Sequence, residues 1–240
     1  MTENQCEFTL THYRAIIRDA LANSFQILRL CDADLVKPGK KQIVLRHDID
    51  FSVESALRLA TVEHELGVAA TYCVLLHSPT YNVGEADTIG LVREIQRLGH
   101  EIALHYDLRF FEDLDVSPAE GIRREAEHLG FLLGAPIISV AQHLPATHGQ
   151  FDGVGDKFVD AYAPRLTADI QYISDSRGRW RAGCVHEHLP TTNTMQLLIH
   201  PEWWVADSHM SQREKISSVV ELRQKQIARA MADYLTRVSD

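Results

Sequence analysis

A repeated unit runs through most of this chain: a short apolar run is followed by polar residues at its end, which we call the polar tip, and then by an amphipathic helix. In the first unit, the apolar run from Gln42 to Leu45 leads to Asp48 and Asp50, and Ser52 is placed to cap the helix that follows. Polar residues end other predicted strands in the same way, namely His105, His143, Asp175 and His200. Strands that alternate with helices predict parallel βαβ units, whose functional residues collect at the carboxyl ends of the strands. We therefore expect these side chains to meet at one rim of an α/β barrel.

The predicted elements follow one another without a linker or a low-complexity tract. We expect a helix and a turn over residues 1–40, the barrel over 42–204 and a charged amphipathic helix over 211–238, so that residues 1–240 form a single domain. Strands are expected over residues 42–45, 68–76, 101–104, 136–141, 170–173 and 195–199. Three glycines between residues 145 and 155 predict a long loop there.

Composition excludes several classes of protein. The 240 residues are 45% hydrophobic and 24% charged, which is typical of a globular protein and excludes disordered, collagen and coiled-coil chains. The formal net charge of -9 argues against binding of nucleic acid through its phosphates. The sequence has neither a run of the roughly 18 apolar residues that a membrane span needs nor an apolar signal segment at its N-terminus. We therefore expect a cytoplasmic protein without a membrane span.

The cysteines and most histidines give weaker signals. Cys6, Cys31, Cys73 and Cys184 lie far apart and form no Cys-x-x-Cys pair, which predicts buried thiols rather than a zinc ribbon or a disulfide framework. Of the 13 histidines, those in or beside helical stretches are expected to face solvent; they include His12.

Three motifs resemble those of the polysaccharide deacetylase superfamily, which includes carbohydrate esterase family four. The family's Asp-x-Asp motif is matched by residues 48–50, its Gly-His-Glu-Ile-x-x-His strand by 99–105 and its Leu-x-Ile-His strand by 197–200. Residues 139–145 and 174–180 occupy the places of two further motifs in altered form. The resemblance implies a single-domain, distorted and incomplete seven-stranded β/α barrel.

The resemblance also implies the roles of the polar tips. Asp50 and His105 would bind one divalent metal ion, while Asp48 would act as the catalytic base. His200 would be the general acid that protonates the leaving amine, and Asp175 would orient its ring or keep it protonated.

The third protein ligand of the metal is open, because Arg109 stands where the family usually has a second histidine. His143, Asp107 or water could complete the site. We favour His143, since imidazole suits borderline cations and a separate strand can approach from a better angle. Zinc is the default metal, although cobalt, nickel, iron or manganese could fit similar ligands.

Four further residues are candidates for substrate binding. Arg109 could bind an anionic part of the substrate or pair with Asp107, and Trp180 and Trp203, with the neighbouring Trp204, could form a wall on which a sugar stacks. We add Tyr106, which lies next to His105.

These features predict a metal-dependent hydrolase that removes an acetyl or related acyl group from an N-acylated amino sugar or carbohydrate precursor. Two alternatives stay open. One is a non-catalytic carbohydrate-binding protein on the same barrel, and the other is a hydrolase of a different non-peptide C–N bond, such as a cyclic amide or ureide. The sequence does not indicate the oligomeric state.

Overall fold

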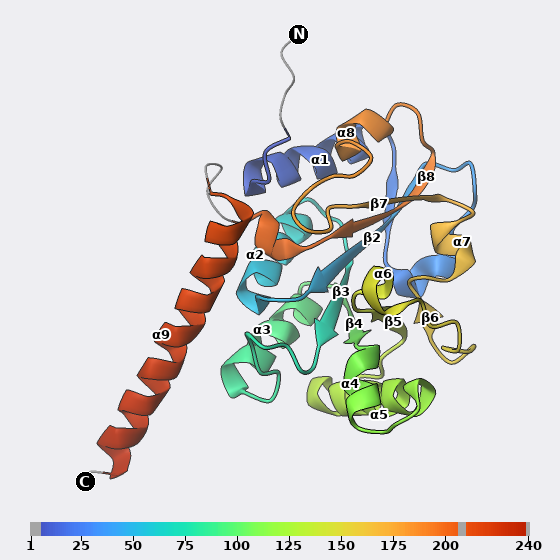
Figure 1. Ribbon diagram of the computed structural model, residues 1–240. Helices are drawn as coiled ribbons and strands as arrows, with labels where there is room; N and C mark the ends of the chain where they lie inside the picture. The colour runs from blue at the N-terminus through green and yellow to red at the C-terminus, as the bar shows by residue number, and fades with distance from the viewer. Residues whose placement is uncertain (1–5, 206–209, 239–240) are drawn as a thin grey trace.

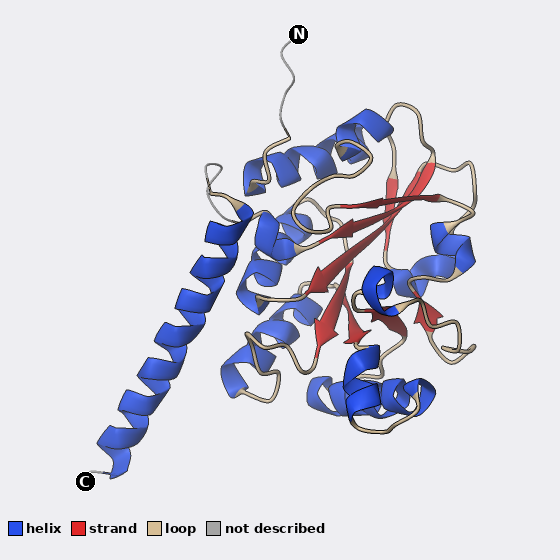
Figure 2. Cartoon of the chain, viewed as in Figure 1, coloured by secondary structure: helices blue, strands red, loops and turns tan. Residues whose placement is uncertain are grey.

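A computed structural model describes residues 6–205 and 210–238 of the chain. Its centre is a parallel sheet in the strand order β6-β5-β4-β3-β2-β8-β7, with helices around it (Figures 1 and 2). The strands are β1 (Gln26–Leu28), β2 (Gln42–Ile49), β3 (Thr71–Leu75), β4 (Glu101–Tyr106), β5 (Ser139–Gln142), β6 (Val159–Asp160), β7 (Gln171–Ser174) and β8 (Thr194–Ile199). The α-helices are α1 (Leu10–Ala22), α2 (Val53–Glu65), α3 (Ala86–Arg97), α4 (Leu108–Asp113), α5 (Pro118–Leu133), α6 (Pro145–His148), α7 (Pro164–Thr167), α8 (Val185–His188) and α9 (Gln212–Val238). Two 3₁₀ helices, η1 (Leu30–Leu35) and η2 (Pro201–Trp203), complete the fold.

The sheet curls into an open barrel, as the sequence predicted. Strands β6 and β7 are the two ends of the seven-strand path and do not pair with each other within the described residues. The rings of Tyr162 and Tyr172 approach each other across this gap, with centroids 6.3 Å apart. The incomplete seven-stranded α/β barrel is therefore confirmed.

Strand β1 is an addition that the sequence pattern did not reveal. It pairs with the first half of β2, Gln26 lying opposite Gln42, while β3 pairs with the second half from Arg46 onward. A strand of three residues is too short to show a periodicity of its own.

Alternation along the strands separates two apolar clusters. Outward side chains such as Ile43 and Leu104 pack against the surrounding helices, whereas inward ones such as Val44, Ala103 and Ala141 fill the barrel. Because successive side chains of a strand point to opposite faces, residues two apart share a face. His105 therefore shares the inward face with Ala103, and Asp48 shares it with Val44.

The helix signals in the sequence are largely confirmed. Ser117 and Pro118 begin α5, and Gly134 ends it in the left-handed conformation, with φ of 69°, that glycine adopts without a steric penalty. The expected loop after residue 145 contains the short helix α6. Helix α9 extends away from the barrel (Figure 1). Among the described residues, no helix is both long and apolar enough to cross a membrane.

Candidate active site

A cavity of about 1030 Å³ opens at the carboxyl ends of the strands. Five of the predicted polar tips line it, namely Asp48, Asp50, His105, His143 and His200. They come from β2, β4, β5 and β8 or from the residues directly after these strands. Asp175, the sixth, follows β7 and lies fully buried behind His200. The structure thus brings together the side chains that the sequence placed on one rim.

Asp50, His105 and His143 form a group of possible metal ligands, with one donor atom from each within 4.8 Å of the others. Asp50 Oδ1 lies 3.3 Å from His105 Nε2 and 3.9 Å from His143 Nε2. This oxygen is buried and has no hydrogen-bond partner among the described residues. Buried polar atoms are normally paired, and two imidazoles with a carboxylate are a donor set that suits a divalent transition metal. The residues present therefore fit the cofactor that the sequence predicted.

Both histidines of this group are held by their other ring nitrogen. His105 Nδ1 lies 3.0 Å from the carbonyl oxygen of Ala141, and His143 Nδ1 lies 3.1 Å from Asp107 Oδ2. If Nδ1 carries the proton in each ring, the Nε2 lone pairs face Asp50, and second-layer contacts of this kind are common around bound metals. Asp107 also caps α4 by accepting a hydrogen bond from the Arg109 amide. Its carboxylate thus lies behind His143 instead of in the ligand group.

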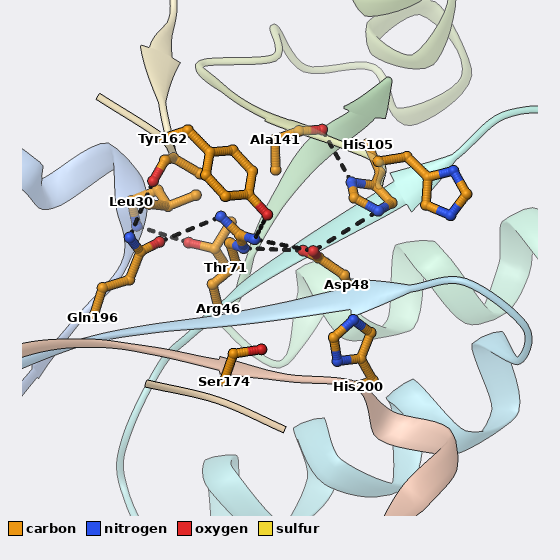
Figure 3. A network of polar contacts seen from close by, with 12 residues as sticks. Leu30, Arg46, Asp48, Thr71, His105, Ala141, Tyr162, Ser174, Gln196 and His200 are labelled. Atoms are coloured by element: carbon orange, nitrogen blue, oxygen red, sulfur yellow. Dashed lines mark hydrogen bonds and ion pairs between the residues drawn. The ribbon is translucent and has the colours of Figure 1, made fainter. Parts of the chain in front are cut away.

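Asp48 is held by a buried arginine that the sequence analysis overlooked (Figure 3). Arg46 Nε lies 3.0 Å from Asp48 Oδ1, and Arg46 Nη2 lies 3.0 Å from Oδ2. Tyr162 Oη accepts a further hydrogen bond from Arg46 at 2.8 Å. Burial opposes the charge on Asp48, but Arg46 and the nearby histidines outweigh it and lower the pKa of Asp48. A signal was present in the sequence, since residues 46 and 48 share a face of one strand.

His200 is oriented by Asp175 on the opposite side of the cavity. Its Nδ1 lies 2.6 Å from Asp175 Oδ1, and the indole of Trp204 donates to Asp175 Oδ2 at 2.7 Å. The Nε2 atom lies 3.9 Å from Asp50 Oδ2. Burial disfavours the charged ring, but the negative charges of Asp175 and Asp50 raise the pKa of His200 to about 10. The ring can therefore hold a proton that it presents to the cavity.

The four predicted substrate-binding residues take different places. Trp203 lines the cavity, and its buried indole Nε1 has no hydrogen-bond partner among the described residues. Arg109 is exposed on α4 and does not line the cavity. Tyr106 points to the outward face of β4, because its neighbour His105 points inward, and it stacks near Phe111.

Trp180 also lies outside the cavity lining. Its indole nitrogen donates a hydrogen bond to Cys6 Sγ at 3.0 Å, and its ring packs near Phe8 and Trp204. The structure therefore gives Trp180, Arg109 and Tyr106 no contact with the cavity, and only Trp203 keeps the position that substrate binding requires.

Three arginines that the sequence did not single out line the cavity instead. Arg177 and Arg181 lie in the segment between β7 and α8, and Arg213 lies in the first turn of α9. All three are exposed, and none forms an ion pair with another described residue. The cavity thus combines a buried acidic and imidazole centre with a cationic mouth.

Solved structures share this fold. No protein-family model matches the chain, and no curated protein matches it either. A polysaccharide deacetylase from Bacillus cereus superposes with a TM-score of 0.50 at 14% identity, covering 91% of this chain and 65% of that one. A second polysaccharide deacetylase from Bacillus cereus gives a TM-score of 0.47 at 15% identity over 79% and 89% of the two chains. A family 4 carbohydrate esterase from Bacillus anthracis gives 0.44 at 15% identity over 89% and 86%. By the first of these superpositions, the chain shares the fold of a solved polysaccharide deacetylase, in agreement with the resemblance of its motifs.

Proposed function

We propose that this protein is a metal-dependent hydrolase that removes an acetyl or related acyl group from an N-acylated amino sugar. The observation that carries the proposal is the convergence of Asp50, His105 and His143 in the cavity, with Asp48 and His200 on either side of them. A protein that only bound carbohydrate would need neither a base nor an acid at these positions. The same arrangement is what hydrolysis of an amide requires.

The residues would divide the reaction between them. Asp50, His105 and His143 would hold a divalent cation, zinc by default, which supplies Lewis-acid activation of water and of the acyl carbonyl. Asp48, fixed by Arg46 and ionised, would accept the proton of the attacking water.

His200 would supply the proton that the departing nitrogen needs. As the C–N bond breaks, the amine leaves with the proton from His200 Nε2, and the carboxylic acid is the second product. Asp175 is a positioning residue, because it holds the Nδ1 side of the ring and does not line the cavity.

The cationic mouth favours a substrate with an anionic substituent, such as a phosphate or a carboxylate. Arginine pairs with both groups in a bidentate manner, and Arg177, Arg181 and Arg213 have no carboxylate partner among the described residues. A phosphorylated or nucleotide-linked amino sugar therefore fits the cavity better than a neutral sugar. The three arginines at the mouth, rather than Arg109, would therefore bind the anionic part of the substrate.

The proposal is tested by measuring acyl release from the zinc- and cobalt-loaded protein. The panel holds N-acetylated sugars in free, phosphorylated and nucleotide-linked form, together with cyclic amides and ureides. We expect release of acetate, fastest with the anionic sugars, and loss of that release in Asp48→Asn with the metal content unchanged. Cleavage of the cyclic compounds alone would move the assignment to another C–N bond. Binding without turnover across the panel would contradict a catalytic role.

The mouth is tested separately by Arg181→Gln and by the control Arg109→Gln, which removes an exposed arginine outside the cavity. We expect Arg181→Gln to raise KM several-fold for an anionic sugar, to leave KM for its neutral counterpart unchanged and to leave kcat within about twofold. Equal effects of both variants on both substrates would contradict the proposal that the substrate carries an anionic substituent.

A further inference from the structure

A second group of metal-binding side chains lies outside the cavity, between α1 and α8. It consists of Cys6, His12, Cys184 and His186, which we call the Cys–His cluster. Cys6 precedes α1 and His12 lies in its first turn, while Cys184 is the N-cap of α8 and His186 lies within α8. The expectation that His12 faces solvent is wrong, because its half-buried ring lies against the two thiols.

Three of five distances within the cluster match those between ligands of one zinc ion, and the other two, between the two sulfurs and between the two ring nitrogens, are shorter. Cys6 Sγ lies 3.0 Å from Cys184 Sγ, and His12 Nε2 lies 3.7 Å from the first sulfur and 3.6 Å from the second. His186 Nδ1 lies 3.6 Å from Cys184 Sγ and 3.1 Å from His12 Nε2. Tetrahedral zinc, with bonds of about 2.3 Å to sulfur and 2.0–2.1 Å to nitrogen, places its ligands about 3.3–3.8 Å apart.

The surroundings of the cluster hold its members in the orientation that a metal needs. His186 Nε2 lies 2.9 Å from Asp19 Oδ2, an arrangement that leaves the Nδ1 lone pair toward the thiols. The indole of Trp180 donates to Cys6 Sγ, and such a hydrogen bond stabilises a thiolate.

We propose that the Cys–His cluster binds a structural zinc ion that fastens α8 to the N-terminal segment and α1. Two thiolates with two imidazoles are a ligand set that zinc favours in closed structural sites. The proposal does not depend on the chemistry of the cavity, because no member of the cluster lines it.

The position of the cluster gives the metal a function in shaping the cavity. The segment between β7 and α8 begins at Asp175, which orients His200, and ends at Cys184 in the cluster. Between these two fixed points it carries Arg177 and Arg181 of the cavity mouth. A zinc ion at Cys184 would hold the far end of this segment and so keep both arginines at the mouth.

The experiment that tests the proposal is absorption spectroscopy of the cobalt-substituted protein. Thiolate ligands give Co²⁺ a charge-transfer band in the near ultraviolet, whereas a site made of one carboxylate and two imidazoles gives none. We expect this band in the parent protein and in Asp50→Ala, which alters only the cavity group. Cys184→Ser, which leaves Cys6 as the one thiolate of the cluster, should lose at least half of the band's intensity, whereas Cys31→Ser, which removes a thiol outside the cluster, should keep all of it.

Release of zinc by a mercurial thiol reagent provides a second measurement on the unaltered protein. We expect about one zinc ion per chain to be released into an indicator dye, with loss of this fraction in Cys184→Ser and not in Cys31→Ser. The parent protein alone decides the outcome even if Cys184→Ser fails to fold. Absence of the cobalt band in the parent would overturn the proposal, as would an intact mass showing that Cys6 and Cys184 form a disulfide in place of metal binding.

Discussion

Two networks that each contain a carboxylate lie on opposite faces of strand β2: the outward one surrounds Glu63 of α2, and the inward one contains Asp50. They differ in whether both oxygens of the carboxylate have a hydrogen-bond partner. On the outward face, His47 Nε2 lies 2.6 Å from Glu63 Oε1, Tyr72 donates to Oε2 at 2.8 Å, and Tyr13 also donates to Oε1. Both oxygens of Glu63 are therefore occupied, and the group is fully buried. On the inward face, Asp50 Oδ1 has no hydrogen-bond partner among the described residues.

The difference shows what separates a structural network from a reactive one. Both networks combine carboxylates with histidines, and both have carboxyl pKa values lowered by their neighbours in spite of burial. In the network of Glu63, both carboxylate oxygens accept hydrogen bonds from protein donors, and these bonds rigidify the packing of α1 and α2 on the sheet. The Oδ1 atom of Asp50 accepts no hydrogen bond from a described residue, and Asp50 lines the cavity, so this oxygen can bind a cation there.

Removal of the Asp50 carboxylate from the inward network should have the largest effect on activity. Asp50→Ala should remove one of three ligands and lower kcat/KM by about 10³-fold or more, while the free energy of unfolding stays within about 1 kcal/mol. Acyl release and urea unfolding of the same preparation measure both quantities. A variant that unfolds easily would mean that Asp50 is a structural residue like Glu63.

The outward network should respond in the opposite way. Glu63→Ala leaves the hydroxyls of Tyr13 and Tyr72 without their acceptor in a buried site and should cost about 3–5 kcal/mol of folding free energy. We expect the fraction that remains folded to keep its kcat. Urea unfolding checks the first effect, with Glu65→Ala on the exposed end of α2 as the control. A stable but inactive Glu63→Ala protein would contradict the division between the two faces.

Much of the inward face was predictable from the sequence because strand periodicity fixes it. His105 ends a strand, and the two-residue period then places it with Ala103 on the inward face and Tyr106 on the outward one. Applied to β2, the same rule would have found Arg46 beside Asp48 and would have placed His47 away from the cavity.

Other contacts could not be predicted from the sequence, because they depend on tertiary packing. Cys6 and Cys184 are 178 positions apart, and neither residue belongs to a recognisable metal-binding motif. Arg213 reaches the cavity only because the first turn of α9 lies over its mouth. Trp180 lies two residues before Ala182, which lines the cavity, yet its ring packs toward Cys6. In irregular segments, sequence position gives no side-chain direction.

The role of Asp107 offers a finer test of the inward network. Asp107→Asn keeps the size of the side chain but removes the charge that faces His143 Nδ1 at 3.1 Å. We expect metal affinity to fall about 10–100-fold, as is typical for loss of a carboxylate behind a metal-bound histidine. Competition with a chelator of known affinity measures it. Complete loss of the metal would instead place Asp107 among the direct ligands, in agreement with the alternative that the sequence left open.

The smallest expected effect is the pH dependence that Glu63 gives to stability. Burial alone would raise the pKa of Glu63, but His47, His100 and the hydroxyl of Tyr13 lower it below the unfolded value of 4.5. A lowered folded pKa means that this stabilisation is present above about pH 4.5 and is lost as the pH falls through the folded pKa. The difference in unfolding free energy between the parent and Glu63→Gln should therefore be largest near neutral pH and shrink as the pH falls below about 4.5. Asp48 and Asp50 contribute equally to both proteins, so the difference reports on Glu63 together with the two histidines that face it, His47 and His100. A difference that stayed constant with pH would show that hydrogen bonding to the tyrosines, and not the charge of Glu63, stabilises the outward face.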